Sequence, residues 1–118
     1  MGFSHSTYHF FGVHVPPKAY QTDHIQRESE WLDGVIRHTP GLNGTGLGHL
    51  TAGDYDRDML FLCVVPDGVS CEVELGQFGR ATREAFSPEW NQLLRQLAEA
   101  AGYSDLDAPA WLVVPDVS

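Results

Sequence analysis

The stretch Met59-Leu-Phe-Leu-Cys-Val-Val65 contains seven apolar residues in succession. A β-strand with this pattern has no polar face, so we expect it to lie inside a sheet with both of its faces covered. The fold therefore depends on which strands pair with this one and on which elements pack against them.

Four other segments have the character of strands. Residues 8–15 are rich in aromatic and β-branched residues and end at Pro16-Pro17, where a strand ladder cannot continue. Residues 69–75 alternate, with Glu72 and Glu74 on one side and apolar residues on the other. Residues 47–51 and 111–114 are short segments that we also expect to be strands.

Two segments have the apolar periodicity of amphipathic helices. The first is predicted to follow Thr22 as its N-cap and to end near His38, before Thr39-Pro40-Gly41. The second is predicted to begin at Ser87-Pro88 and to end at Gly102. Its apolar residues recur at helical spacing and are Trp90, Leu93, Leu94, Leu97 and Ala101.

The elements follow the order βαβββαβ within a single domain, residues 1–118. We expect an α+β fold in the form of a two-layer sandwich, with both helices on one face of an antiparallel sheet in a ferredoxin-like arrangement. This leaves the helix-free sheet face without cover. Either a second copy of the chain packs on that face in a homodimer, or the sheet curls and its second face lines a ligand cavity.

The chain is acidic, with sixteen acidic and seven basic residues and a net charge of −9. This charge argues against nucleic-acid and membrane-surface partners. The sequence has no apolar run long enough for a membrane helix and no secretory signal pattern, so we expect a cytoplasmic protein. Six arginines against one lysine favour a bacterial source with a GC-rich genome.

Histidines are frequent, with six in the chain. His9, His14 and His49 would lie close together if the strands that carry them were neighbours in the sheet. Imidazoles that titrate near neutral pH suit acid–base catalysis, so these three are the catalytic candidates. The alternative for each is a structural histidine, and the residue spacing typical of zinc sites does not occur.

Two further groups are candidates for ligand binding. Gly44, Gly46 and Gly48 belong to a glycine-rich loop that could cover a pocket, although it lacks the motifs of nucleotide-binding loops. Glu72 and Glu74 share one strand face and could divide acid and base roles, although such alternation is more often a solvated face.

Asp54, Asp56 and Asp58 are the candidates for metal binding, because they alternate as at the start of a calcium loop. Met59 and Val65 stand where such a loop requires glycine and glutamate, which excludes an EF-hand. A polar turn beside a very apolar strand is the simpler interpretation, and we expect no cofactor.

The βα start, the turn Thr39-Pro40-Gly41 and the glycine-led strand after it resemble the dimeric ferredoxin-like barrels of the antibiotic-biosynthesis monooxygenase superfamily. The resemblance covers about residues 1–65 and implies a dimer and a small enzyme. The strand at 69–75 and the connection at 76–87 depart from that pattern, and no catalytic residue is carried over from the family.

The sequence contains no complete catalytic or cofactor-binding motif. The leading hypothesis is therefore a non-catalytic homodimeric protein that binds a protein partner or a small ligand. The alternative is a small monooxygenase-like enzyme that uses His9, His14 or His49 for acid–base chemistry beneath the glycine-rich loop.

Overall fold

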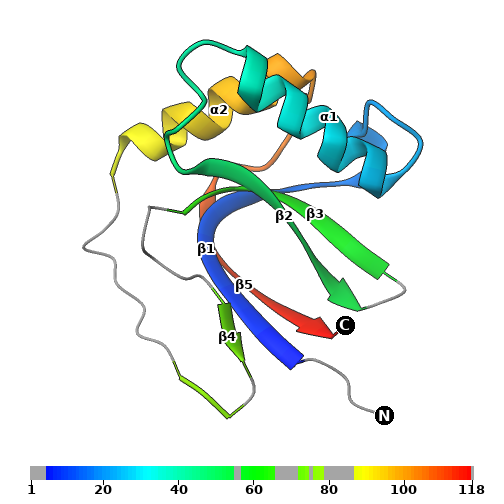
Figure 1. Cartoon of the computed structure of the whole chain (residues 1–118), viewed down its shortest axis with the longest axis vertical. Coiled ribbons are helices and arrows are strands. Elements are labelled where there is room, and N and C mark those ends of the chain that lie inside the picture. The colour runs from blue at the N-terminus through cyan, green and yellow to red at the C-terminus, as the bar shows by residue number, and fades with distance from the viewer. Residues whose placement is uncertain (1–4, 55–56, 66–71, 75, 79–86, 118) are drawn as a thin grey trace.

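The computed structural model describes residues 5–54, 57–65, 72–74, 76–78 and 87–117. They form an α+β fold with a five-stranded curled sheet and two helices (Figure 1). The elements are β1 (His5–Val15), a short 3₁₀ helix (Pro17–Ala19), α1 (Ile25–His38), β2 (Leu47–Asp54), β3 (Arg57–Val64), β4 (Glu72–Glu74), α2 (Glu89–Ala101) and β5 (Ala110–Val117). Among the helices described, none has the length and apolar character to cross a membrane.

The apolar strand predicted at residues 59–65 is β3, and it lies inside the sheet. One edge pairs antiparallel with β2, and the other pairs antiparallel with the second half of β1. Leu60, Leu62 and Val64 face the helices, whereas Phe61 and Cys63 face the opposite side, and all five are buried. Both faces of this strand are therefore covered within one chain.

The sheet curls because β1 has three partner strands. One edge of β1 pairs with β5 over residues 5–12. Its other edge pairs with β4 over residues 6–8 and with β3 over residues 11–15. β2 meets β5 where the backbone of Asp54 pairs with that of Val117. The strands β1, β3, β2 and β5 thus follow one another around a closed path.

Both helices pack on the same side of the sheet, as Figure 1 shows. Their buried residues share one core with the alternate residues Phe11, Val13 and Val15 of β1. The ends of α2 agree with the prediction to within two residues, and Gly102 closes the helix in the left-handed conformation with φ of 90°. Glycine is favoured there because a Cβ atom disfavours positive φ.

The opposite face of the sheet, which the sequence left without cover, forms a second apolar core inside the curl. Phe10 and Phe61 meet there edge to face, with their ring centroids 5.5 Å apart. Ala52, Cys63 and Val114 are buried around them. The structure thus shows the curl that one of the two alternatives required, but side chains fill the inner face, and its buried residues line none of the three hollows described below. The burial of this face within one chain removes the reason from which a second copy was inferred.

Candidate functional site

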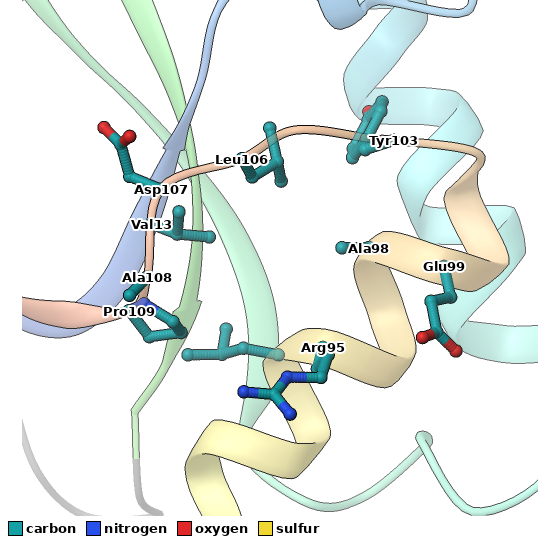
Figure 2. Close-up of a pocket in the computed structure, with 10 residues that line it drawn as sticks. Val13, Arg95, Ala98, Glu99, Tyr103, Leu106, Asp107, Ala108 and Pro109 are labelled. Carbon is teal, nitrogen blue, oxygen red and sulfur yellow. The ribbon is translucent and has the colours of Figure 1, made fainter.

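A cavity of about 360 Å³ lies between β1, α2 and the segment 103–109 that leads from α2 to β5 (Figure 2). Its floor is apolar, and Val13, Leu94 and Tyr103 in it are buried residues of the main core. The remaining lining residues are Arg95, Ala98, Glu99, Leu106, Asp107, Ala108 and Pro109. A hollow with a large apolar surface and few polar groups is the usual form of a small-molecule site.

The cavity exists because the chain folds back over α2 before it enters β5. The N–H of Gly102 donates to the carbonyl of Glu99, and the N–H of Tyr103 donates to that of Ala98, over 2.9 Å. Asp105 has a φ of 60°, a conformation that aspartate adopts more readily than most residues. The segment therefore leaves the helix in a sharp turn and runs beside the exposed flank of its last turns.

Tyr103 is held at the end of the cavity by a buried carboxylate, that of Glu28 on α1. The Tyr103 hydroxyl donates to Glu28 Oε2 over 2.6 Å. The backbone N–H groups of Gln21 and Thr22 and the Thr22 hydroxyl donate to the same carboxylate over 2.7–3.0 Å. Glu28 is 0% exposed. It therefore joins α1, the segment before it and the wall of the cavity.

The electrostatics of this cluster follow from its burial and its donors. Burial alone would raise the pKa of Glu28, but the hydrogen bonds from Gln21, Tyr103 and Thr22 outweigh it and hold that pKa below its ordinary value of 4.5. Burial, together with the neighbouring Glu28 charge, raises the pKa of Tyr103. Glu28 is therefore an anion and Tyr103 a neutral donor at physiological pH.

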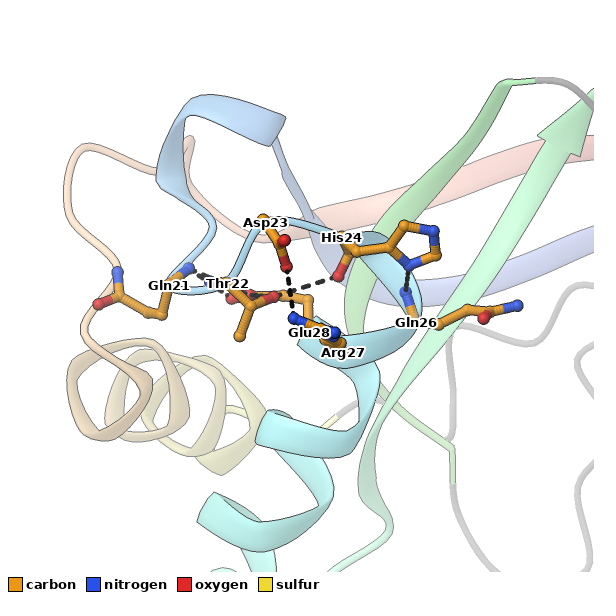
Figure 3. Close-up of polar contacts among 7 residues, drawn as sticks. All are labelled: Gln21, Thr22, Asp23, His24, Gln26, Arg27 and Glu28. Carbon is orange, nitrogen blue, oxygen red and sulfur yellow. Dashed lines mark hydrogen bonds and ion pairs between the residues drawn. The ribbon is translucent and has the colours of Figure 1, made fainter.

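The sequence assigned the N-cap of α1 to Thr22, and this prediction was wrong. The helix begins at Ile25, and His24 is the N-cap, with its Nδ1 accepting from the N–H of Gln26 over 3.2 Å (Figure 3). The hydroxyl of Thr22 is engaged by Glu28 and by the carbonyl of His24 instead. A buried carboxylate competes more strongly for this hydroxyl than a helix end does.

Two other hollows are larger than this cavity but are lined mainly by polar side chains. One, of about 520 Å³, lies at the start of α1 and beside β2 and β3, and its lining includes His24, Glu30 and Asp58. The other, of about 450 Å³, runs along the outer side of α2. Each has a single apolar lining residue, Ile25 in the first and Pro88 in the second, so both offer less of the hydrophobic contact on which small-ligand affinity usually depends.

The three histidine candidates lie apart from one another. β3 separates β1 from β2, so the premise that these strands are neighbours was wrong. His9 contacts Trp111, with ring centroids 5.3 Å apart, whereas His14, on the opposite face of β1, contacts Phe61 at 5.4 Å. His49 pairs with Asp33 of α1, with Nε2 and Oδ1 2.6 Å apart. Each histidine thus has its own protein contact.

The glycine candidates do not enclose the cavity. Gly44 and Gly46 have φ of 80° and 83° in the turn after α1, and Gly48 lies within β2. Glu72 and Glu74 are exposed on β4, and Ser6 of β1 donates its hydroxyl to Glu72 over 2.7 Å. None of these five residues lines any of the three hollows described above.

The aspartate candidates lie near the β2–β3 connection. Asp56 and the side chain of Asp54 lie outside the described residues, and Asp58 is exposed at the start of β3. Within the part of the chain that the structure describes, no group of three or more histidine, cysteine, aspartate or glutamate side chains is placed to hold a metal ion.

The residues that form the cavity were not among the sequence candidates. They include Arg95 and Ala98 on α2 and Leu106 and Pro109 after it. One signal was present: between Gly102 and the strand predicted at residue 111, the sequence contains isolated apolar residues without helical or strand periodicity. Such a segment runs over the surface of its own domain and can wall off a hollow.

Comparisons of the chain with protein-family models, with curated proteins and with solved structures gave no match.

Proposed function

We propose that the protein is a non-catalytic binding domain whose cavity between α2 and the segment 103–109 takes a small apolar ligand. The observation that carries this proposal is the apolar floor of a 360 Å³ hollow. That volume is within the range of about 300–1,000 Å³ in which small-molecule sites fall. The rigid α2 helix and the Glu28–Tyr103 hydrogen bond support it, because a preformed wall lowers the entropic cost of binding.

Binding is better supported than the histidine-based enzyme. His9, His14 and His49 contact separate groups on different faces of the sheet, and none of them lines the cavity. An acid–base site needs its groups within hydrogen-bond reach of one bound molecule. A ligand in the cavity has no such histidine beside it.

The proposal can be tested by filling the cavity with a larger side chain. The neutral fluorescent probe N-phenylnaphthylamine should bind the wild-type protein saturably and brighten as it enters an apolar site. Ala98→Phe places a ring in the cavity and should weaken probe binding by about tenfold or more, a loss of roughly 1.4 kcal/mol per factor of ten. Fluorescence titration measures both affinities.

Ala100→Phe is the matched control, because Ala100 lies on the same helix but is exposed and does not line the cavity. It should bind the probe as the wild type does. Circular dichroism would show that both variants are folded. Equal affinity in all three proteins, or no binding by the wild type, would contradict the proposal.

We also propose that the sheet is a ferredoxin-like arrangement to which β4 is added. The antiparallel pairs β5–β1, β1–β3 and β3–β2 support this, as does the place of both helices on one side. In this view β4 extends the edge of β1 that β3 leaves free.

The homodimer is proposed at a different surface from the inner face of the sheet. Val113 of β5 is 64% exposed and pairs with His9 of β1, on the same face of the sheet as Phe11 and Trp111 of the main core. A second copy packed on this face would cover the exposed Val113 side chain, and this supports the proposal. We expect sedimentation equilibrium at micromolar concentration to give a dimer for the wild type and a monomer for Val113→Asp, and a monomeric wild type would contradict this.

A further inference from the structure

One charged side chain is directed at the opening of the cavity, that of Arg95. It comes from the middle of α2, one turn before Ala98. Figure 2 shows its guanidinium extended across the opening toward Pro109 on the facing segment. Below it lies the apolar floor that Leu94 and Val13 form. A molecule that fills the floor would therefore bring its outer end to this guanidinium.

Within the described part of the chain, the side chain of Arg95 takes part in no ion pair or hydrogen bond. A carboxylate is available one helical turn later, since Glu99 stands at the i+4 position where helix ion pairs usually form. Glu99 lines the same cavity as Arg95 and, like Arg95, also lines the hollow along the outer side of α2, but no ion pair joins the two side chains. Figure 2 shows the carboxylate of Asp107 pointing away from the cavity.

We propose that the ligand of this cavity is an amphipathic anion, whose apolar body fills the floor and whose carboxylate or similar oxyanion pairs with Arg95. This inference rests on the proposed function and adds the chemical class of the ligand. The planar guanidinium presents a fork of N–H donors that matches a carboxylate, and charge-assisted pairs of this kind are stronger than neutral hydrogen bonds.

The net charge of −9 acts against any anion. Two of the acidic residues, Glu99 and Asp107, line the cavity themselves. The charge of acidic residues more than about 8 Å away is largely screened at physiological ionic strength. Arg95 is exposed, and an oxyanion at the opening of the cavity would contact its guanidinium directly. We expect this direct contact to outweigh the repulsion from Glu99 and Asp107 in measurements at physiological salt.

Two probes with the same ring system separate the contribution of the negative charge to binding affinity from the contribution of the apolar rings. Anilinonaphthalene sulfonate is N-phenylnaphthylamine with an added sulfonate, and both fluoresce on entering an apolar site. We expect Arg95→Gln to weaken binding of the sulfonate by about tenfold. Binding of the neutral probe should change by less than about twofold, because its ring contacts are kept. Titrations at physiological salt give all four affinities.

Arg37→Gln is the matched control, because Arg37 is an exposed arginine in the last turn of α1, away from the cavity. It should alter the binding of neither probe. Sulfonate binding that survives Ala98→Phe would place the anion outside the cavity and overturn the inference.

The outcomes distinguish this inference from the proposed function. If the neutral probe binds but Arg95→Gln leaves the sulfonate affinity unchanged, the anionic preference is wrong and the apolar site stands. If neither probe binds the wild-type protein, the proposed function fails and the inference fails with it.

Discussion

Replacing Gly12 by alanine is expected to destabilise the protein by about 3 kcal/mol or more, at the upper end of what overpacking costs. A Cβ atom on Gly12 would lie 2.2 Å from the carbonyl oxygen of Leu62 on β3 and 3.0 Å from the ring of Phe10. The first of these atoms is backbone in a paired strand, so it cannot move aside as a side chain could. Urea unfolding followed by tryptophan fluorescence measures the change in the free energy of unfolding.

Gly34→Ala is the matched control for that experiment. Gly34 lies within α1, and an added Cβ would meet no atom within 4 Å. Alanine should therefore stabilise the protein by roughly 0.5–1 kcal/mol through its higher helix propensity. If Gly12→Ala lowers the free energy of unfolding while Gly34→Ala raises it, the loss is caused by the close approach of β1 and β3 at Gly12. A Gly12→Ala variant as stable as the wild type would show that β1 does not approach β3 in this way.

The parts of the fold that follow from local patterns could be predicted from the sequence. The two-residue period of a strand predicts from the sequence that Phe11 and Val13 lie on one face of residues 8–15 and that Phe10 and His14 lie on the other. The structure confirms this division. The ends of α2 followed from Ser87-Pro88 and Gly102, because proline and glycine act on the backbone directly. These are effects of neighbouring residues along the chain.

The curl of the sheet could not be predicted from such patterns. The curl requires that one edge of β1 pairs with β4 up to residue 8 and with β3 from residue 11. It also requires that Gly12 approaches β3 closely. A single glycine in a strand indicates a bend or a close approach but does not identify the partner strand. The grouping of histidines failed for the same reason, since it depended on a pairing of β1 with β2 that β3 prevents.

The candidate site could not be predicted from the sequence, because a charged residue within a helix usually faces water. Glu28 lies within α1 among polar neighbours, yet it is fully buried with donors from Gln21, Thr22 and Tyr103. Tyr103 is distant in the sequence, so only the tertiary fold brings this donor to the carboxylate. Arg95 likewise belongs by its sequence position to the solvated side of α2, and only the returning segment 103–109 makes it part of a cavity.

Replacing Glu28 by glutamine is expected to cost about 3 kcal/mol of stability at neutral pH, because the hydrogen bonds of a buried carboxylate are charge-assisted and the amide group turns a donor toward other donors. The N–H of Gln21 and the hydroxyl of Tyr103 lose their charged acceptor. Urea unfolding at neutral pH measures the loss. Glu30→Gln, an exposed position on the same helix, should stay within about 0.5 kcal/mol of the wild type.

The free energies of unfolding of the wild type and of Glu28→Gln should change differently in acid. The pKa of Glu28 in the folded protein lies below its ordinary value of 4.5, so the carboxylate stabilises the fold above that pH. This contribution is lost as the pH falls from 4.5 through the lower pKa of the folded state. The stability difference between the wild type and Glu28→Gln should therefore shrink over this range. A difference that stays constant or grows in acid would show that the Glu28 charge does not hold the cavity wall in place.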